Sequence, residues 1–142
     1  MMRFLALALL LAFVPTPPAA AAAAKVEVAN GDWSFLPVMK KRSNDHLSNK
    51  AIFRIHEIVT ERQCTLPVRL VGTLVEFDLS FAAHFSPDGT LNRVVLPRLG
   101  CPEAEGIIGG VLLKMIEGGD YRPDGSNPEG WYRGDLSFTV SG

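Results

Sequence analysis

A strict alternation of side chains over residues 75–85 constrains the fold more than any other feature. The odd positions are apolar, and the even positions, apart from Ala82, are polar (Glu76, Asp78, Ser80, His84). Because successive side chains of a β-strand point to opposite faces of a sheet, this pattern indicates a half-buried strand. Residues 86–90 (Ser-Pro-Asp-Gly-Thr) are typical of a tight turn, and residues 91–96 supply a second strand. The stretch therefore predicts a β-hairpin, and other elements must cover its apolar face because a lone hairpin is marginal in water.

Two further segments have the period of amphipathic helices. In residues 43–63, after candidate N-caps at 43–45, apolar side chains recur at spacings of three and four: Leu47, Ala51, Ile52, Ile55, Ile58 and Val59. A second helix is predicted to begin at Pro102, a residue suited to the first helical position. Its apolar positions follow the same spacing, and Gly118 and Gly119 end it in the manner of a C-cap.

The order of the predicted elements defines the fold class. A last strand is predicted at residues 131–140, after a polar loop rich in Pro and Gly. Helix, strand, strand, helix, strand predicts an α+β two-layer domain, with a three-stranded antiparallel sheet and both helices on its one apolar face. The first arm of the hairpin is the expected central strand, so the last strand has a free outer edge. Such an edge is either blunted or used to bind an extended segment of a partner.

The N-terminal residues match a cleavable secretory signal. Arg3 precedes an apolar run at residues 4–14, which is followed by prolines and then by the small residues 19–24. The run is shorter than the roughly 20 apolar residues that a membrane-spanning helix needs. We therefore expect a signal peptide at residues 1–24, an extended arm at 25–42 and a domain at 43–142. The mature chain would have no membrane span and would be periplasmic or secreted.

Cys64 and Cys101 are the only two cysteines of the chain. In an exported chain an even number of cysteines favours a disulfide. The alternatives are a reactive thiol pair or half of a metal site, and neither is favoured, since there is no C-x-x-C motif and no nearby His cluster. The bridge would close a loop of 37 residues. The chain-entropy model assigns a loop of that size about 4 kcal/mol of stabilisation.

Charge and motif content exclude several function classes. Loss of Arg3 with the signal leaves 13 basic side chains against 15 acidic ones, which is not the footprint of a nucleic-acid-binding protein. His46, His56 and His84 lack the spacing of a metal site. The glycines of the second helix lie inside its periodic pattern, so they indicate close packing rather than a phosphate loop. We therefore expect no catalytic residues, no metal, no cofactor and no nucleic-acid partner.

The succession of motifs resembles the C-terminal domain of the TonB energy-transducer proteins, with TolA as a structural relative. The resemblance covers residues 70–140, and these segments carry it: Val75-Glu-Phe-Asp-Leu79, Ser86-Pro-Asp-Gly-Thr-Leu91, Val94-Val95, the helix at 107–115, Tyr121-Arg-Pro123 and Leu136-Ser-Phe138. TonB proteins carry an uncleaved membrane helix and a long Pro-rich spacer, in place of which this chain has a cleavable signal. The resemblance implies the fold and a role in binding envelope proteins that is linked to envelope transport, without a tether for transmitting force.

Together, the resemblance and the free edge predict a non-enzymatic adaptor that binds an extended segment of an envelope protein, for example an outer-membrane receptor. The expected contact residues are those of the last strand: Gly134, Asp135, Leu136, Ser137, Phe138, Thr139 and Val140. The backbone would supply affinity and the outward side chains specificity. A homodimer through edge strands is an open alternative. So is a small secreted enzyme, or a structural or inhibitory protein, with its site on the hairpin face or with Trp33 or Trp131 as anchor.

Overall fold

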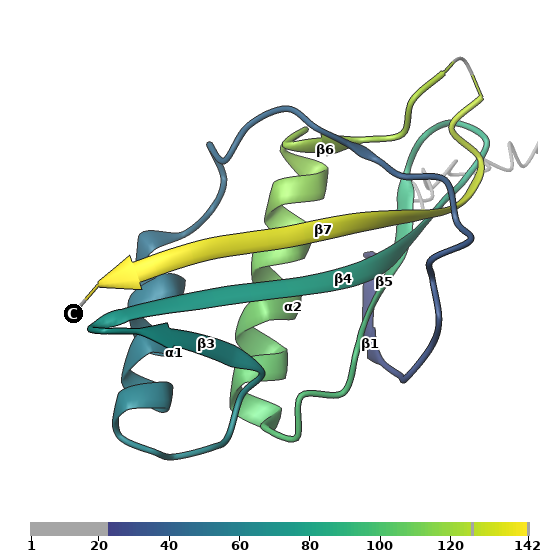
Figure 1. The fold of residues 1–142 in the computed structure, drawn as a ribbon. Helices are drawn as coiled ribbons and strands as arrows, with labels where there is room; N and C mark the ends of the chain where they lie inside the picture. The colour runs from purple at the N-terminus through teal and green to yellow at the C-terminus, as the bar shows by residue number, and fades with distance from the viewer. Residues whose placement is uncertain (1–22, 126, 142) are drawn as a thin grey trace, which may run out of the picture.

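A computed structural model describes residues 23–125 and 127–141 (Figure 1). Of the predicted signal peptide, residues 1–22 lie outside the described part. The elements in chain order are β1 (Lys25–Val28), β2 (Lys40–Lys41), α1 (Asn49–Thr60), β3 (Val68–Val71), β4 (Leu74–Phe85), β5 (Leu91–Leu96), α2 (Pro102–Glu117), β6 (Tyr121–Arg122) and β7 (Gly130–Ser141). The chain is therefore an α+β protein with two helices, as the sequence predicts.

Strand β4 is the centre of the main sheet, and its alternating burial confirms the predicted hairpin arm. One edge of β4 is paired along its whole length with β7, in antiparallel register from Leu74–Ser141 to Phe85–Gly130. The other edge is shared end to end by β3, opposite residues 74–77, and by β5, opposite residues 82–85. Strand β1 then adds to β5 in parallel.

The main sheet thus has five strands rather than the predicted three. Strand β3 folds back on β4 through a tight turn in which Gly72 has a φ of 62°, a value that glycine adopts without steric cost. The short run at 68–71 carries no alternation that would reveal it. The predicted extended arm at 25–42 instead supplies β1, and also β2, which pairs with β6 in a separate two-stranded sheet. Their partners lie more than 60 residues away, where local patterns hold no information.

Helix α1 is shorter than the predicted span of 43–63 because its first turn begins later. Ser48 is the N-cap, and its hydroxyl accepts a hydrogen bond from the backbone N–H of Ala51 at 3.2 Å. The predicted caps at 43–45 do not start the helix, since this turn is bonded instead to a carboxylate at the end of α2, described below. Helix α2 begins at Pro102 and has Gly118 as its C-cap, as predicted.

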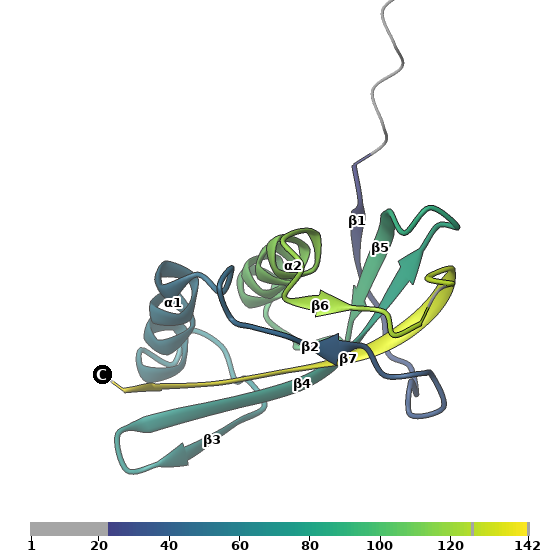
Figure 2. The same cartoon turned by 90° about the horizontal axis from the view of Figure 1, so that it is seen from above.

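Both helices lie on one face of the sheet and form the core with it (Figure 2). The apolar positions of β4 pack there against side chains of both helices, with Phe77, Phe81, Ile55, Ile58, Ile108, Leu112 and Met115 almost fully buried. Burial of each such side chain contributes about 1.5–3 kcal/mol. The predicted disulfide between Cys64 and Cys101 joins the loop after α1 to the start of α2, with an S–S distance of 2.06 Å. The face of the sheet opposite the helices is called the open face below.

Candidate functional site

The predicted binding edge on β7 is covered over its first part. The N–H of Arg133 donates to the carbonyl of Pro37 at 2.8 Å, and the N–H of Met39 donates to the carbonyl of Arg133 at 2.7 Å. Two residues further on, the hydroxyl of Tyr121 donates to the carbonyl of Asp135 at 2.7 Å. Gly134 points into the core, where a Cβ would overlap the ring of Phe81. The structure therefore places Gly134 and Asp135, the first two predicted contact residues, beside chain that already occupies the edge.

The remainder of β7 forms the rim of the sheet, and we call residues 136–141 the free edge (Figure 1). Backbone groups alternate in direction along a strand, so the outward groups at Arg133 imply outward groups at Ser137 and Thr139 as well. Within the described residues, no hydrogen bond reaches these outward groups of Ser137 and Thr139. Ser137 and Thr139 therefore present two outward N–H and two outward C=O groups to an incoming strand.

A groove of about 510 Å³ runs beside the free edge. Its lining comes from the turn before α1, from α1 itself and from strands β4 and β7: Asn44, Leu47, Ile52, Glu76, Phe77, Asp78, Ser137, Phe138 and Thr139. Phe138 stacks on Phe77 with 5.0 Å between ring centroids, and it remains partly exposed toward the groove. Leu47 and Ile52 are partly exposed on the opposite wall. Leu47, Ile52 and Phe138 therefore form the apolar part of an otherwise mainly polar groove, next to unpaired main-chain groups.

Asp120 holds the turn that forms one wall of this groove. Its carboxylate accepts hydrogen bonds from the hydroxyl of Ser43 at 2.6 Å and from the backbone N–H of His46 at 2.9 Å. The imidazole Nδ1 of His46 lies 2.8 Å from the same carboxylate. Burial works to raise the pKa of Asp120, but the hydrogen bonds from Ser43 and His46 outweigh it and leave the pKa below its ordinary value of 3.8. We call these three residues the Asp120 clasp.

The sequence alone does not reveal the clasp, because Ser43 and His46 lie 77 and 74 residues before Asp120. In the sequence, His46 shows only that it lacks the spacing of a metal ligand, and Asp120 comes directly before the polar loop rich in Pro and Gly. Burial of Asp120, which is 1% exposed, is the property that distinguishes this carboxylate from the others, and burial follows only from the tertiary fold. The one local signal is the Ser-Asn-Asp run at 43–45, which favours side-chain bonding to the backbone.

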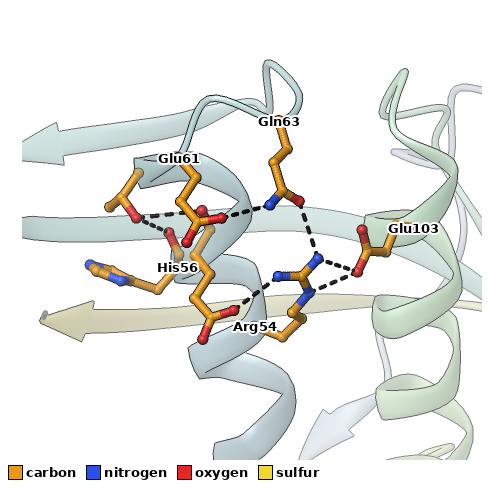
Figure 3. Close-up of polar contacts among 7 residues, drawn as sticks. Arg54, His56, Glu61, Gln63 and Glu103 are labelled. Atoms are coloured by element: carbon orange, nitrogen blue, oxygen red, sulfur yellow. Dashed lines mark hydrogen bonds and ion pairs between the residues drawn. The ribbon is translucent and has the colours of Figure 1, made fainter.

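A second polar cluster joins the two helices around Arg54 (Figure 3). The guanidinium donates to Glu103 at 2.7 Å, to Glu57 at 2.9 Å and to Gln63 at 3.1 Å, and Gln63 in turn donates to Glu61 at 2.7 Å. These contacts connect α1, the loop that follows it and the first turn of α2, close to the disulfide. The guanidinium of Arg54 is bonded to three side chains of the protein itself. We therefore interpret the cluster as a brace between the helices and not as a ligand site.

On the hairpin face, the structure separates His84 from the two carboxylates of β4. Glu76, Asp78 and His84 share the open face of β4, but His84 is six residues from Asp78, or roughly 20 Å along the strand. His84 instead packs against Trp131, with 5.0 Å between ring centroids and the ring planes tilted by 59°. Among residues 23–125 and 127–141, no three His, Cys, Asp or Glu side chains gather in a way that would hold a metal ion.

Trp33 is half-buried and lies outside the main core. It lines a small pocket of about 290 Å³ on the open face together with Ser80, Pro97 and Arg133.

In the described part of the chain, no helix combines the length and the apolar character needed to cross a bilayer. No protein-family model, no curated protein and no solved structure matches this chain. The geometry of the free edge and its groove therefore carries the functional argument.

Proposed function

We propose that this protein is a non-enzymatic binding domain, of the kind formed by TonB C-terminal domains, that takes up an extended segment of an envelope protein along the free edge of β7. The observation that carries the proposal is the pair of unbonded outward residues, Ser137 and Thr139, lying directly beside a groove that contains the apolar side chains of Leu47, Ile52 and Phe138. Strand addition uses these two elements, since main-chain hydrogen bonds fix the segment and pockets for alternate side chains select it.

The free energies involved indicate that binding of a segment needs apolar contacts in the groove as well as main-chain hydrogen bonds at the edge. Each main-chain hydrogen bond contributes about 0.5–1.5 kcal/mol net. Ordering the backbone of a flexible segment costs about 1–2 kcal/mol per residue. Four hydrogen bonds therefore do not compensate for ordering five or six residues, and burial of apolar side chains beside Leu47, Ile52 and Phe138 has to supply the difference. A segment without apolar residues at alternate positions is expected to bind poorly.

The proposed location is the periplasm or the exterior of the cell. The disulfide between Cys64 and Cys101 supports it, because such bonds persist in oxidising compartments. The signal-like pattern at residues 1–24 supports it as well. A partner in the envelope, with a role in transport, follows from the resemblance to the TonB family and is part of the proposal.

The experiment is a photocrosslink in the producing cell, with the probe at Thr139 and a second probe at Lys114 on the exposed side of α2. We expect Ser137→Pro to abolish capture at Thr139, because proline removes an outward N–H while the pairing with β4 uses the neighbouring residues. Ser137→Ala keeps the N–H and should retain capture. Thermal unfolding of both variants checks that the fold is intact. Equal capture by Ser137→Pro and wild type, or equal capture at Lys114, would contradict edge recognition.

A further inference from the structure

The free edge separates two surfaces of different chemistry, and this difference indicates what kind of segment fits. We propose that the bound segment alternates basic and apolar residues, with the apolar side chains facing α1 and the basic side chains lying over the open face. This inference rests on the proposed function and adds the chemical class of the partner.

On the helix side of the edge the side chains of β7 are apolar. The side chains of β7 that point there are Leu136, Phe138 and Val140, which are buried or partly buried. Across the groove lie Leu47 and Ile52. Every second residue of an added strand would point into this recess, since side chains alternate between the faces of a sheet. These positions therefore require apolar side chains.

On the open face the same edge is acidic. The register places Asp78 beside Ser137, Glu76 beside Thr139, and Ser80 beside Asp135. The charge of Glu76 is compensated by an ion pair with Arg69, and Asp135 lies 4.0 Å from Arg133. Among the ion pairs of the described residues, none involves Asp78, whose side chain is exposed. Asp78 is thus the uncompensated carboxylate of this surface.

The spacing lets a long basic side chain reach Asp78. Neighbouring strands are about 4.8 Å apart, so a residue added outside Ser137 lies two spacings, roughly 10 Å, from the backbone of Asp78. Only the short side chain of Ser137 stands between them. The apolar stem of a Lys or Arg can lie across this serine and bring its charge to the carboxylate, as such side chains do on many surfaces. An acidic residue at the same position would meet an unfavourable charge.

The same charges argue against a second copy of this chain as the occupant. Pairing of two free edges would bring Asp78 and Asp135 of both copies to one continuous face. The free edge of a second copy carries no basic side chain at residues 136–141, so it would leave Asp78 without a counter-charge. A basic segment of another protein supplies this charge, and it is the occupant to which we commit.

The test uses the purified disulfide-bonded protein and three end-blocked octapeptides, alternating Lys-Val, Thr-Val or Glu-Val. Binding is followed by NMR through the amide signals of Ser137 and Thr139. We expect the affinity to fall in the order Lys-Val, Thr-Val, Glu-Val. Asp78→Asn should weaken the Lys-Val peptide roughly two- to fivefold, the range of exposed charge pairs, and leave Thr-Val unchanged. The preference should shrink in molar salt. The control is Asp124→Asn, an exposed acid in the loop before β7, which should change neither affinity.

The outcomes separate this inference from the proposed function. If Lys-Val and Thr-Val bind the edge equally well, or if Asp78→Asn has no effect, the basic alternation is wrong while edge recognition stands. If none of the peptides shifts the signals of Ser137 and Thr139, both proposals are overturned. A dimer in sedimentation velocity that Ser137→Pro dissociates would show that a second copy occupies the edge, and would also overturn this inference.

Discussion

Replacing Asp120 with Asn tests whether one buried carboxylate holds the wall of the groove. The carboxylate accepts hydrogen bonds from Ser43 and from the backbone of His46, at 2.6 and 2.9 Å. An asparagine retains one oxygen for Ser43 but turns its NH₂ group toward the N–H of His46, where two donors meet. Hydrogen bonds to charged groups contribute about 1.5–3 kcal/mol, so we expect a loss of about 2–3 kcal/mol in the free energy of unfolding.

Urea unfolding of the oxidised protein measures this difference, and its pH dependence gives a second test. The pKa of Asp120 is lowered in the folded state, so the folded protein favours the ionised form. Its contribution is fully present above the ordinary value of 3.8 and is lost as the pH falls through the folded-state pKa. The difference between wild type and Asp120→Asn should therefore be constant at neutral pH and shrink in acid below pH 3.8.

Asp124→Asn is the matched control, since an exposed acid outside the clasp should change stability by less than about 0.5 kcal/mol. The reasoning is refuted if Asp120→Asn is as stable as this control, or if its deficit is the same in acid as at neutral pH. If it holds, peptide binding at the free edge should also weaken in Asp120→Asn, because the turn carrying Leu47 loses its support.

Two further predictions concern stability. Replacing both Cys64 and Cys101 with Ala should lower the free energy of unfolding by about 4 kcal/mol, because the bridge closes a 37-residue loop; urea unfolding with and without reductant measures this, and an unaffected wild type in reductant would contradict it. Gly134→Ala should cost about 1–3 kcal/mol, because the new methyl overlaps the ring of Phe81. Gly106→Ala, in open space on α2, should instead gain up to about 1 kcal/mol, and thermal unfolding that shows equal effects would refute the packing argument.

The parts of the fold that were predicted correctly are those with local signals. Residues 75–85 alternate strictly, and β4 is the central strand, because a period of two is written in consecutive residues. Helix α2 has its proline start, its apolar spacing and its glycine end within one stretch of chain. The disulfide followed from the number of cysteines and the expected compartment. Each of these inferences needs no knowledge of a distant partner.

Other features were missed because they depend on residues far apart in the sequence. The start of α1 was placed too early, since Ser43 and its neighbours look like caps until Asp120 is seen to bind them. Strand β3 has too few residues and too little alternation to be recognised without its partner, and for the same reason the sequence left β1 open between a short strand and a mobile arm. The two-layer arrangement was nevertheless predicted correctly, because it is determined by burial of the apolar faces of the helices and the sheet.

The candidate site shows the same division most clearly. By itself the sequence determined that the last strand alternates and that it has an outer edge. Only the tertiary structure decided which part of that edge is available, because Pro37, Met39 and Tyr121 bind its first part and leave Ser137 and Thr139 open. It also placed Asp78 beside Ser137 and Leu47 across the groove. Side-chain periodicity is a property of neighbouring residues, whereas exposure of an edge depends on which distant segments pack against it.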